Sequence, residues 1–133
     1  MSAVLADTHA AIWYLREPEQ LSRRARAALD GAATSNNPIY VASITLVEMR
    51  YLVERGRLPD EAMQRLLDAI DDPTSALELT PLDRGVAQTL ALIARDEVPD
   101  MPDRIIAATA FHLGLPLVTR DHRIRASSVT TIW

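Results

Sequence analysis

Residues 4–13 of the chain read VLADTHAAIW and contain the pattern on which the fold is built. The apolar run Val4-Leu5-Ala6 predicts a first strand, and Asp7 follows it directly. Residues 10–15 then have the pattern of a helix. A strand that leads at once into a helix is the first half of a strand–helix–strand unit, from which parallel sheets are built.

The rest of the chain repeats this alternation. Strands are predicted at residues 4–6, 38–42, 76–79 and 115–118, with a short fifth at 129–133, and helices at residues 10–15, 23–32, 44–54, 59–70, 82–95 and 103–113. Ser22 and Ser43 are expected to cap the helices that follow them. Gly31, Gly56 and Gly114 are expected to help end helices. The prediction is a single α/β domain over residues 1–133, with a central, mostly parallel sheet of four to five strands flanked by helices.

Composition excludes several classes of protein. The chain has 133 residues, enough for one core, and no apolar stretch approaches the ~18 residues of a membrane span. There is no cysteine, which excludes disulfides and thiolate metal sites. The first residues lack the basic region of a signal peptide. We therefore expect a cytoplasmic protein that does not contact membrane.

The net charge of −4 is unevenly distributed. Residues 1–103 carry a net charge of −7. Residues 104–133 carry a net charge of +3, because they contain four arginines and a single acid, Asp121. All fourteen basic residues are arginine. The chain therefore has a local basic region that can contact phosphate. The absence of lysine excludes any mechanism that needs one.

Acidic residues fall where an open parallel sheet binds its ligands, beyond the carboxyl ends of the strands. Asp7 follows the first predicted strand and Asp121 follows the fourth. Asp103 opens the helix that leads into that fourth strand, and Asp100 lies one turn before it. Taken singly, each aspartate has the commoner interpretation of a helix cap or of a charge that favours a helix N-terminus.

Glu48 is harder to explain as a structural residue. On its helix it shares a face with Ile44 and Leu52, so we expect it to point inward, and its neighbours three residues away are Thr45 and Tyr51. An inward carboxylate is costly without a partner, such as a cation or an arginine from elsewhere. Arg104 is one candidate for that arginine.

The carboxylates of Asp7, Glu48, Asp103 and Asp121 together indicate a metal site. Carboxylates gathered within ~4–6 Å repel one another by roughly 1–4 kcal/mol per close pair, a cost that helix capping does not require. An oxygen-only ligand set suits Mg²⁺ or Mn²⁺ rather than zinc. Hydrolysis of a phosphodiester by a metal-activated water is the chemistry that such a site favours.

The chain resembles the PIN-domain ribonucleases, and especially the VapC-type toxins, in four stretches that follow the family's order. These stretches are VLADTHAAIW at residues 4–13, SITLVE at 43–48, PDRIIAATA at 102–110 and LPLVTRD at 115–121. The resemblance implies a PIN-like three-layer fold. It also implies cleavage of RNA that leaves a 5′-phosphate and a 3′-hydroxyl.

The resemblance assigns roles to individual residues. Asp7, Glu48, Asp103 and Asp121 would be the metal-binding catalytic acids, and Thr119 would supply a hydroxyl near the metal or its water. The role of Asp100 stays open at this point. The family further implies a homodimer and a cognate antitoxin, a segment of which lies across the active site and silences it.

Other residues near these motifs have weaker indications. Arg104, Arg120 and Arg123 are candidates for binding the RNA substrate, although a charged run commonly faces solvent. A metal-activated water makes proton transfer by His9 or His122 unnecessary. Trp13 and Phe111 are expected in the core. Leu46, Met49, Leu66 and Leu67 form an apolar excess that favours a dimer face or a groove for a partner helix.

Several other functions fit less well. A receiver domain or a dehalogenase-like phosphatase would need a lysine and a second acid near Asp7, and a Rossmann-type nucleotide binder would need a glycine-rich turn there. Two alternatives stay open within the resemblance. One is a housekeeping RNA-processing nuclease, and the other is a catalytically idle PIN module that binds a protein partner.

Overall fold

The computed structural model describes residues 2–133, and at its centre lies a sheet of five strands that are all parallel. The strands are β1 (Val4–Ala6), β2 (Ile39–Ala42), β3 (Leu77–Thr80), β4 (Leu117–Val118) and β5 (Thr131–Ile132), in the spatial order β3-β2-β1-β4-β5. Leu5 of β1 is paired with Tyr40 of β2 and with Leu117 of β4. The predicted strands are confirmed. Four of the five strands begin one or two residues later than predicted, and β3 ends one residue later, at Thr80.

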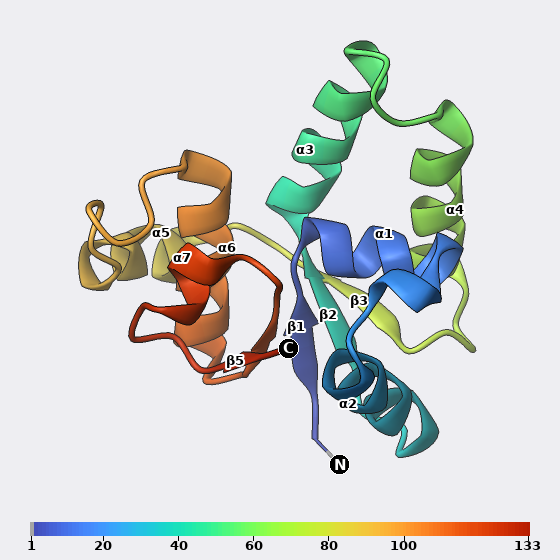
Figure 1. Cartoon of the computed structure of the whole chain (residues 1–133), viewed down its shortest axis with the longest axis horizontal. Helices are drawn as coiled ribbons and strands as arrows, with labels where there is room; N and C mark the ends of the chain where they lie inside the picture. Colours follow the sequence, from blue (N-terminus) through green and yellow to red (C-terminus); the bar gives the residue numbers. More distant parts are fainter. Residues whose placement is uncertain (1) are drawn as a thin grey trace.

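Helices cover both faces of the sheet and make a three-layer α/β fold (Figure 1). The helices are α1 (Thr8–Arg16), α2 (Arg23–Thr34), α3 (Ser43–Glu54), α4 (Asp60–Asp71), α5 (Arg84–Thr89), α6 (Met101–Leu113) and α7 (His122–Arg125), with 3₁₀ turns η1 (Pro18–Gln20) and η2 (Leu90–Leu92). Helices α1, α2 and α4 lie on one side of the sheet, and α5, α6 and α7 lie on the other.

Strand β1 shows why the strands have continuous apolar runs in the sequence. Val4 and Ala6 belong to the core on the α1–α2 side, and Leu5 belongs to the core on the α6 side. All three are almost completely buried. Successive side chains of a strand point to opposite faces, so a strand covered by helices on both faces needs apolar residues at every position.

Helix α3 extends from the carboxyl end of β2 and brings the two helical layers together (Figure 1). It contacts α6 from one layer, and α1 and α4 from the other. Its first serine was expected to act as an N-terminal cap, but this expectation is wrong. The helix begins at Ser43 itself, and the Ser43 hydroxyl accepts a hydrogen bond from the backbone N–H of Leu82 at 3.0 Å.

Two predicted helix ends differ from the structure. Gly31 does not end α2, which continues to Thr34; the chain turns at Asn36, whose φ is +57°. The helix predicted over residues 82–95 is only α5, followed by the 3₁₀ turn η2. At the end of this segment, the guanidinium of Arg104 donates hydrogen bonds to the carbonyls of Leu90 and Ile93. Gly56 and Gly114 have positive φ just beyond α3 and α6, as expected.

Within residues 2–133, no helix has both the length and the apolar composition that crossing a membrane requires.

Candidate metal centre

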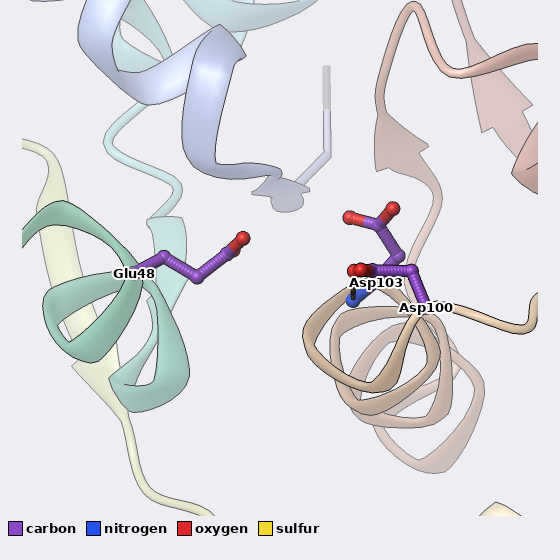
Figure 2. A group of neighbouring side chains, drawn as sticks. All are labelled: Glu48, Asp100 and Asp103. Atoms are coloured by element: carbon purple, nitrogen blue, oxygen red, sulfur yellow. Dashed lines mark hydrogen bonds between the residues drawn. The ribbon is translucent and has the colours of Figure 1, made fainter. Parts of the chain in front are cut away.

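Five carboxylates line one cavity of about 550 Å³ at the carboxyl edge of the sheet. They belong to Asp7, Glu48, Asp100, Asp103 and Asp121, residues from four separate parts of the chain. Figure 2 shows Glu48 extending from α3 toward Asp100 and Asp103 at the start of α6. One carboxylate oxygen from each of these three lies within 4.8 Å of the other two. The fold therefore gathers the acids that the sequence places far apart.

Three of the aspartates also cap helices. Asp7 accepts a hydrogen bond from the Ala10 N–H at 2.8 Å, Asp100 from the Asp103 N–H at 3.2 Å, and Asp121 from the Arg123 N–H at 2.9 Å. The capping interpretation and the metal-site interpretation are therefore compatible. Each cap engages one carboxylate oxygen and fixes the direction of the other.

Three of the acids, Asp7, Glu48 and Asp103, have pKa values above those of ordinary carboxyl groups. Burial raises the pKa of Asp7 and that of Glu48. Burial, together with the charges of Asp100 and Asp121, raises the pKa of Asp103 to about 8. Among residues 2–133, every ion pair joins other residues, and none brings an arginine to these five acids. A cation is the partner that this cluster lacks, and its oxygen ligands fit a hard divalent ion.

Buried hydroxyl groups hold the acids in place. Thr8 donates to Glu48 Oε1 at 2.6 Å, and its oxygen lies 3.0 Å from the Thr45 hydroxyl. Thr119 is completely buried, hydrogen-bonds the Asp7 carboxylate and accepts from the Asp121 N–H at 3.0 Å. The expected hydroxyl near the acids is thus Thr119. Thr8 and Thr45 were not predicted.

Arg104 lies elsewhere than the sequence interpretations suggested. Its guanidinium donates to the carbonyl of Ile93 and to that of Leu90, both at 2.8 Å. Arg104 makes no ion pair with Glu48, and it is not among the residues that line the acidic cavity. Its neighbour Asp103 does line the cavity, because consecutive helical residues point in different directions.

Comparison with known proteins places this geometry in a family. Residues 4–128 match the family model described as PIN domain. The chain belongs to the PIN-domain family. It is 33% identical over 138 residues to Ribonuclease VapC22 of Mycobacterium tuberculosis, and the similarity covers 100% of both chains.

Two solved structures have the same fold. The structure of VapBC2 from Rickettsia felis, bound to a DNA fragment from its promoter, superposes with a TM-score of 0.72 at 18% identity, over 97% of this chain and 96% of that one. The DNA-bound VapBC of Salmonella typhimurium has a TM-score of 0.65 at 25% identity, over 98% and 97% of the two chains.

In this PIN domain the four predicted acids meet in one cavity, and the structure adds Asp100 as a fifth. The Asp100 and Asp103 carboxylates each bring an oxygen within 4.8 Å of one from Glu48, because Asp100 caps α6 and Asp103 is on its first turn. The sequence feature that could have identified Asp100 as part of the site was its position three residues before Asp103. Sequence alone does not fix where the helix begins, and the predicted start at Asp103 was two residues late.

The face of α3 that carries Glu48 borders a second, apolar groove of the PIN domain. Ile44 and Leu52 are half-buried there, and Val47 and Tyr51 are 62% and 58% exposed. The residues buried on this helix are Thr45 and Met49. Of the four apolar residues predicted to be divided between the core and an interaction face, Met49 and Leu66 are in the core, and Leu46 and Leu67 are half-buried.

Thr8→Val is expected to weaken the centre without removing any acid. The substitution keeps the shape of the side chain but leaves Glu48 without its buried donor, and it leaves the Thr45 hydroxyl without a partner. An unsatisfied buried polar group costs about 1–3 kcal/mol, and loss of a group that orients a metal ligand typically lowers metal affinity 10- to 100-fold. Thermal unfolding and metal titration measure the two effects. Thr8→Ser, which keeps the hydroxyl, should restore both, and failure to do so would contradict the assigned hydrogen bond.

Arg104→Lys is expected to reduce stability by about 1.5–3 kcal/mol, the usual worth of hydrogen bonds to a charged group. Lysine has no planar guanidinium that can donate to two carbonyls at once. Residues 90–93 would therefore lose the hydrogen bonds that join them to α6. Denaturant unfolding measures the loss. If Arg104 instead served mainly to bind RNA, as the sequence suggested, the variant would unfold like the parent and would bind RNA more weakly.

Proposed function

We propose that this chain is a metal-dependent endoribonuclease that acts as the toxin of a toxin–antitoxin pair and hydrolyses RNA phosphodiesters. The observation that carries the proposal is the convergence of five carboxylates, three of them with raised pKa values, in a cavity with no arginine paired to them among residues 2–133. The full-length identity of 33% to Ribonuclease VapC22 supports the same activity. Residues 1–133 would form one nuclease domain.

Asp7, Glu48, Asp103 and Asp121 would hold the ion, Mg²⁺ or Mn²⁺, with Asp100 at the same cavity wall. When bound, the ion would supply positive charge for the phosphate and a water whose pKa is lowered. The protein's own contribution is orientation. Thr8 fixes the carboxylate of Glu48, and Thr119 fixes both the Asp7 side chain and the backbone of Asp121.

Arg120 and Arg123 are the basic residues that line the same cavity, and they are the proposed contacts for RNA phosphates. They lie on the loop after β4 and at the start of α7, next to the acid Asp121. Acidic walls repel a polyanion, so binding requires positive charge close by. RNA affinity should therefore fall as salt concentration rises, with a slope that becomes shallower when either arginine is removed.

The cognate antitoxin is proposed to occupy the apolar groove beside α3. This groove of about 720 Å³ is lined by Ile44, Val47, Tyr51 and Leu52, and Glu48 belongs to its wall as well as to that of the acidic cavity. A partner segment bound in the groove would reach the acids and block access to them. The fold shared with the VapBC assembly of Salmonella typhimurium, at 25% identity, supports a protein partner.

A homodimer is proposed from exposed apolar side chains that do not line the groove beside α3. Leu92 and Met101 are each 62% exposed. Exposed apolar residues on a small protein favour association. Light scattering at micromolar concentration tests this, and a mass of one chain would contradict it.

The activity test uses the purified, antitoxin-free protein and a structured RNA in Mg²⁺ or Mn²⁺. We expect cleavage that a chelator abolishes, and products with a 5′-phosphate and a 3′-hydroxyl. Binding of metal without turnover on several RNAs would point to a narrower target. Failure to bind any divalent metal would contradict the proposal and would favour an idle module that only binds a protein.

A further inference from the structure

Beside the acids, the same cavity has a wall of aromatic and guanidinium groups. The arginine side chain of Arg120 lies over the indole of Trp13, with its central carbon 4.6 Å from the ring centroid. The His9 and Trp133 rings have centroids 5.5 Å and 6.0 Å from that of Trp13. His9, Trp13 and Arg120 all line the acidic cavity. Trp13 was expected in the core, but only part of it packs there.

The position of Trp13 relative to the acids is set by one helix. Asp7 caps α1 and Trp13 lies six residues further along, a rise of about 9 Å. The Thr8–Glu48 hydrogen bond ties the start of the same helix to α3. A group stacked on Trp13 is therefore held at a fixed distance from the acids, as selection of a cleavage position requires.

Arg120 is not engaged in a structural ion pair. Among residues 2–133, no carboxylate forms an ion pair with it, and its guanidinium contacts the Trp13 ring. The side chain as a whole is exposed. A guanidinium that lies over an indole keeps an outer planar face, and both tryptophan rings and arginine planes are surfaces on which RNA bases stack.

We propose that Trp13 and Arg120 form a subsite for a nucleobase next to the scissile phosphodiester, and that this subsite helps to determine where RNA is cut. The inference rests on the proposed ribonuclease function and goes beyond it. The acids would hold the metal ion, the charges of Arg120 and Arg123 would contact phosphate, and the planar faces of Trp13 and Arg120 would hold the flanking base. Stacking contacts the face and not the edge of a base, so the subsite selects position on the strand more than the identity of the base.

Variants of the two residues separate this role from simple packing. Trp13→Leu should raise KM by roughly 5- to 150-fold, the loss expected for one stacked base, with a small change in kcat. Arg120→Lys keeps the charge for phosphate but loses the planar face, so it should also raise KM. Arg120 is exposed, so this second variant keeps the test valid if Trp13→Leu folds poorly. If the pair only packs α1 against the loop after β4, Arg120→Lys would lower stability and leave KM unchanged.

A binding experiment follows Trp13 directly. The chain has two tryptophans, so Trp133→Phe combined with Asp7→Asn gives a protein that cleaves slowly enough for binding measurements and in which Trp13 is the sole tryptophan. A short RNA that contains the bond cut by the parent should quench its fluorescence. The same RNA with an abasic residue beside that bond should bind more weakly and quench little.

The outcomes distinguish the two proposals. Cleavage by the parent, with equal KM for parent and both variants and equal quenching by the abasic RNA, would overturn the subsite and leave the nuclease function standing. Absence of cleavage by the parent on any RNA, with no divalent metal bound, would overturn the function and the subsite with it.

Discussion

Asp7→Asn is expected to lower RNA cleavage on the order of 10²–10³-fold while the protein stays folded. Asparagine has the shape of aspartate and is an equally good N-terminal cap, so its oxygen still accepts from the Ala10 N–H. What the substitution removes is a negative charge at the centre of the acidic cavity. Loss of one preorganised electrostatic group at a reacting centre typically costs that factor in rate.

Cleavage rates, circular dichroism and metal titration of the same preparations test this expectation. The matched control is Asp68→Asn, which makes the same chemical change on the exposed face of α4, where the Asp68 carboxylate accepts a hydrogen bond from Gln64. The control should cleave like the parent. A folded Asp7→Asn protein with parental activity would show that the cleavage comes from a contaminating nuclease or from another site.

The metal-free protein is expected to lose stability as the pH rises from about 4 to about 8, and divalent metal should reverse the trend. The folded protein keeps a proton on Asp103 up to a pKa of about 8, whereas the unfolded chain releases it near 3.8. The folded state therefore binds more protons within this window. The stabilising contribution is complete below the unfolded pKa and is lost as pH passes through the folded one. The raised pKa values of Asp7 and Glu48 act in the same direction.

Metal binds the deprotonated carboxylates, so its effect has the opposite sign. At a concentration of one hundred times Kd, an ion that binds only the folded state adds about 2.7 kcal/mol of stability. The increase in Tm on adding Mg²⁺ or Mn²⁺ should therefore be small near pH 5 and largest at pH 8 and above. Differential scanning calorimetry across this range, with and without metal, measures both trends.

Asp103→Asn is the variant that tests the assignment of this pH dependence. It should flatten the stability profile of the metal-free protein and should reduce the metal-induced rise in Tm. The control is Asp96→Asn, at an exposed position outside the cavity. If Asp103→Asn retained the parental profile in both conditions, the raised pKa of Asp103 would not be the origin of the effect.

Local sequence pattern was enough to predict the layers of the fold and most of the acids. The apolar runs of β1, β2 and β4 identify strands covered on both faces, because burial on both sides requires apolar residues at every position. Asp7 and Asp121 come directly after such strands, and the ends of parallel strands share one edge of the sheet. Their convergence therefore follows from the order of the elements alone.

Only the tertiary structure decided how the side chains around those acids are used. The contact between Thr8 and Glu48 joins residues 40 positions apart, and it depends on where α1 and α3 cross. Arg104 donates to a carbonyl of the short 3₁₀ turn η2, which the helical pattern of the sequence did not reveal. Trp13 packs partly against the core and also lines the cavity. Periodicity assigns a residue to a face of its own helix, but the partner on that face depends on how distant elements pack. For this protein, the sequence determined the sheet and the acids at its edge, whereas packing between helices determined what holds those acids in place and what lies beside them.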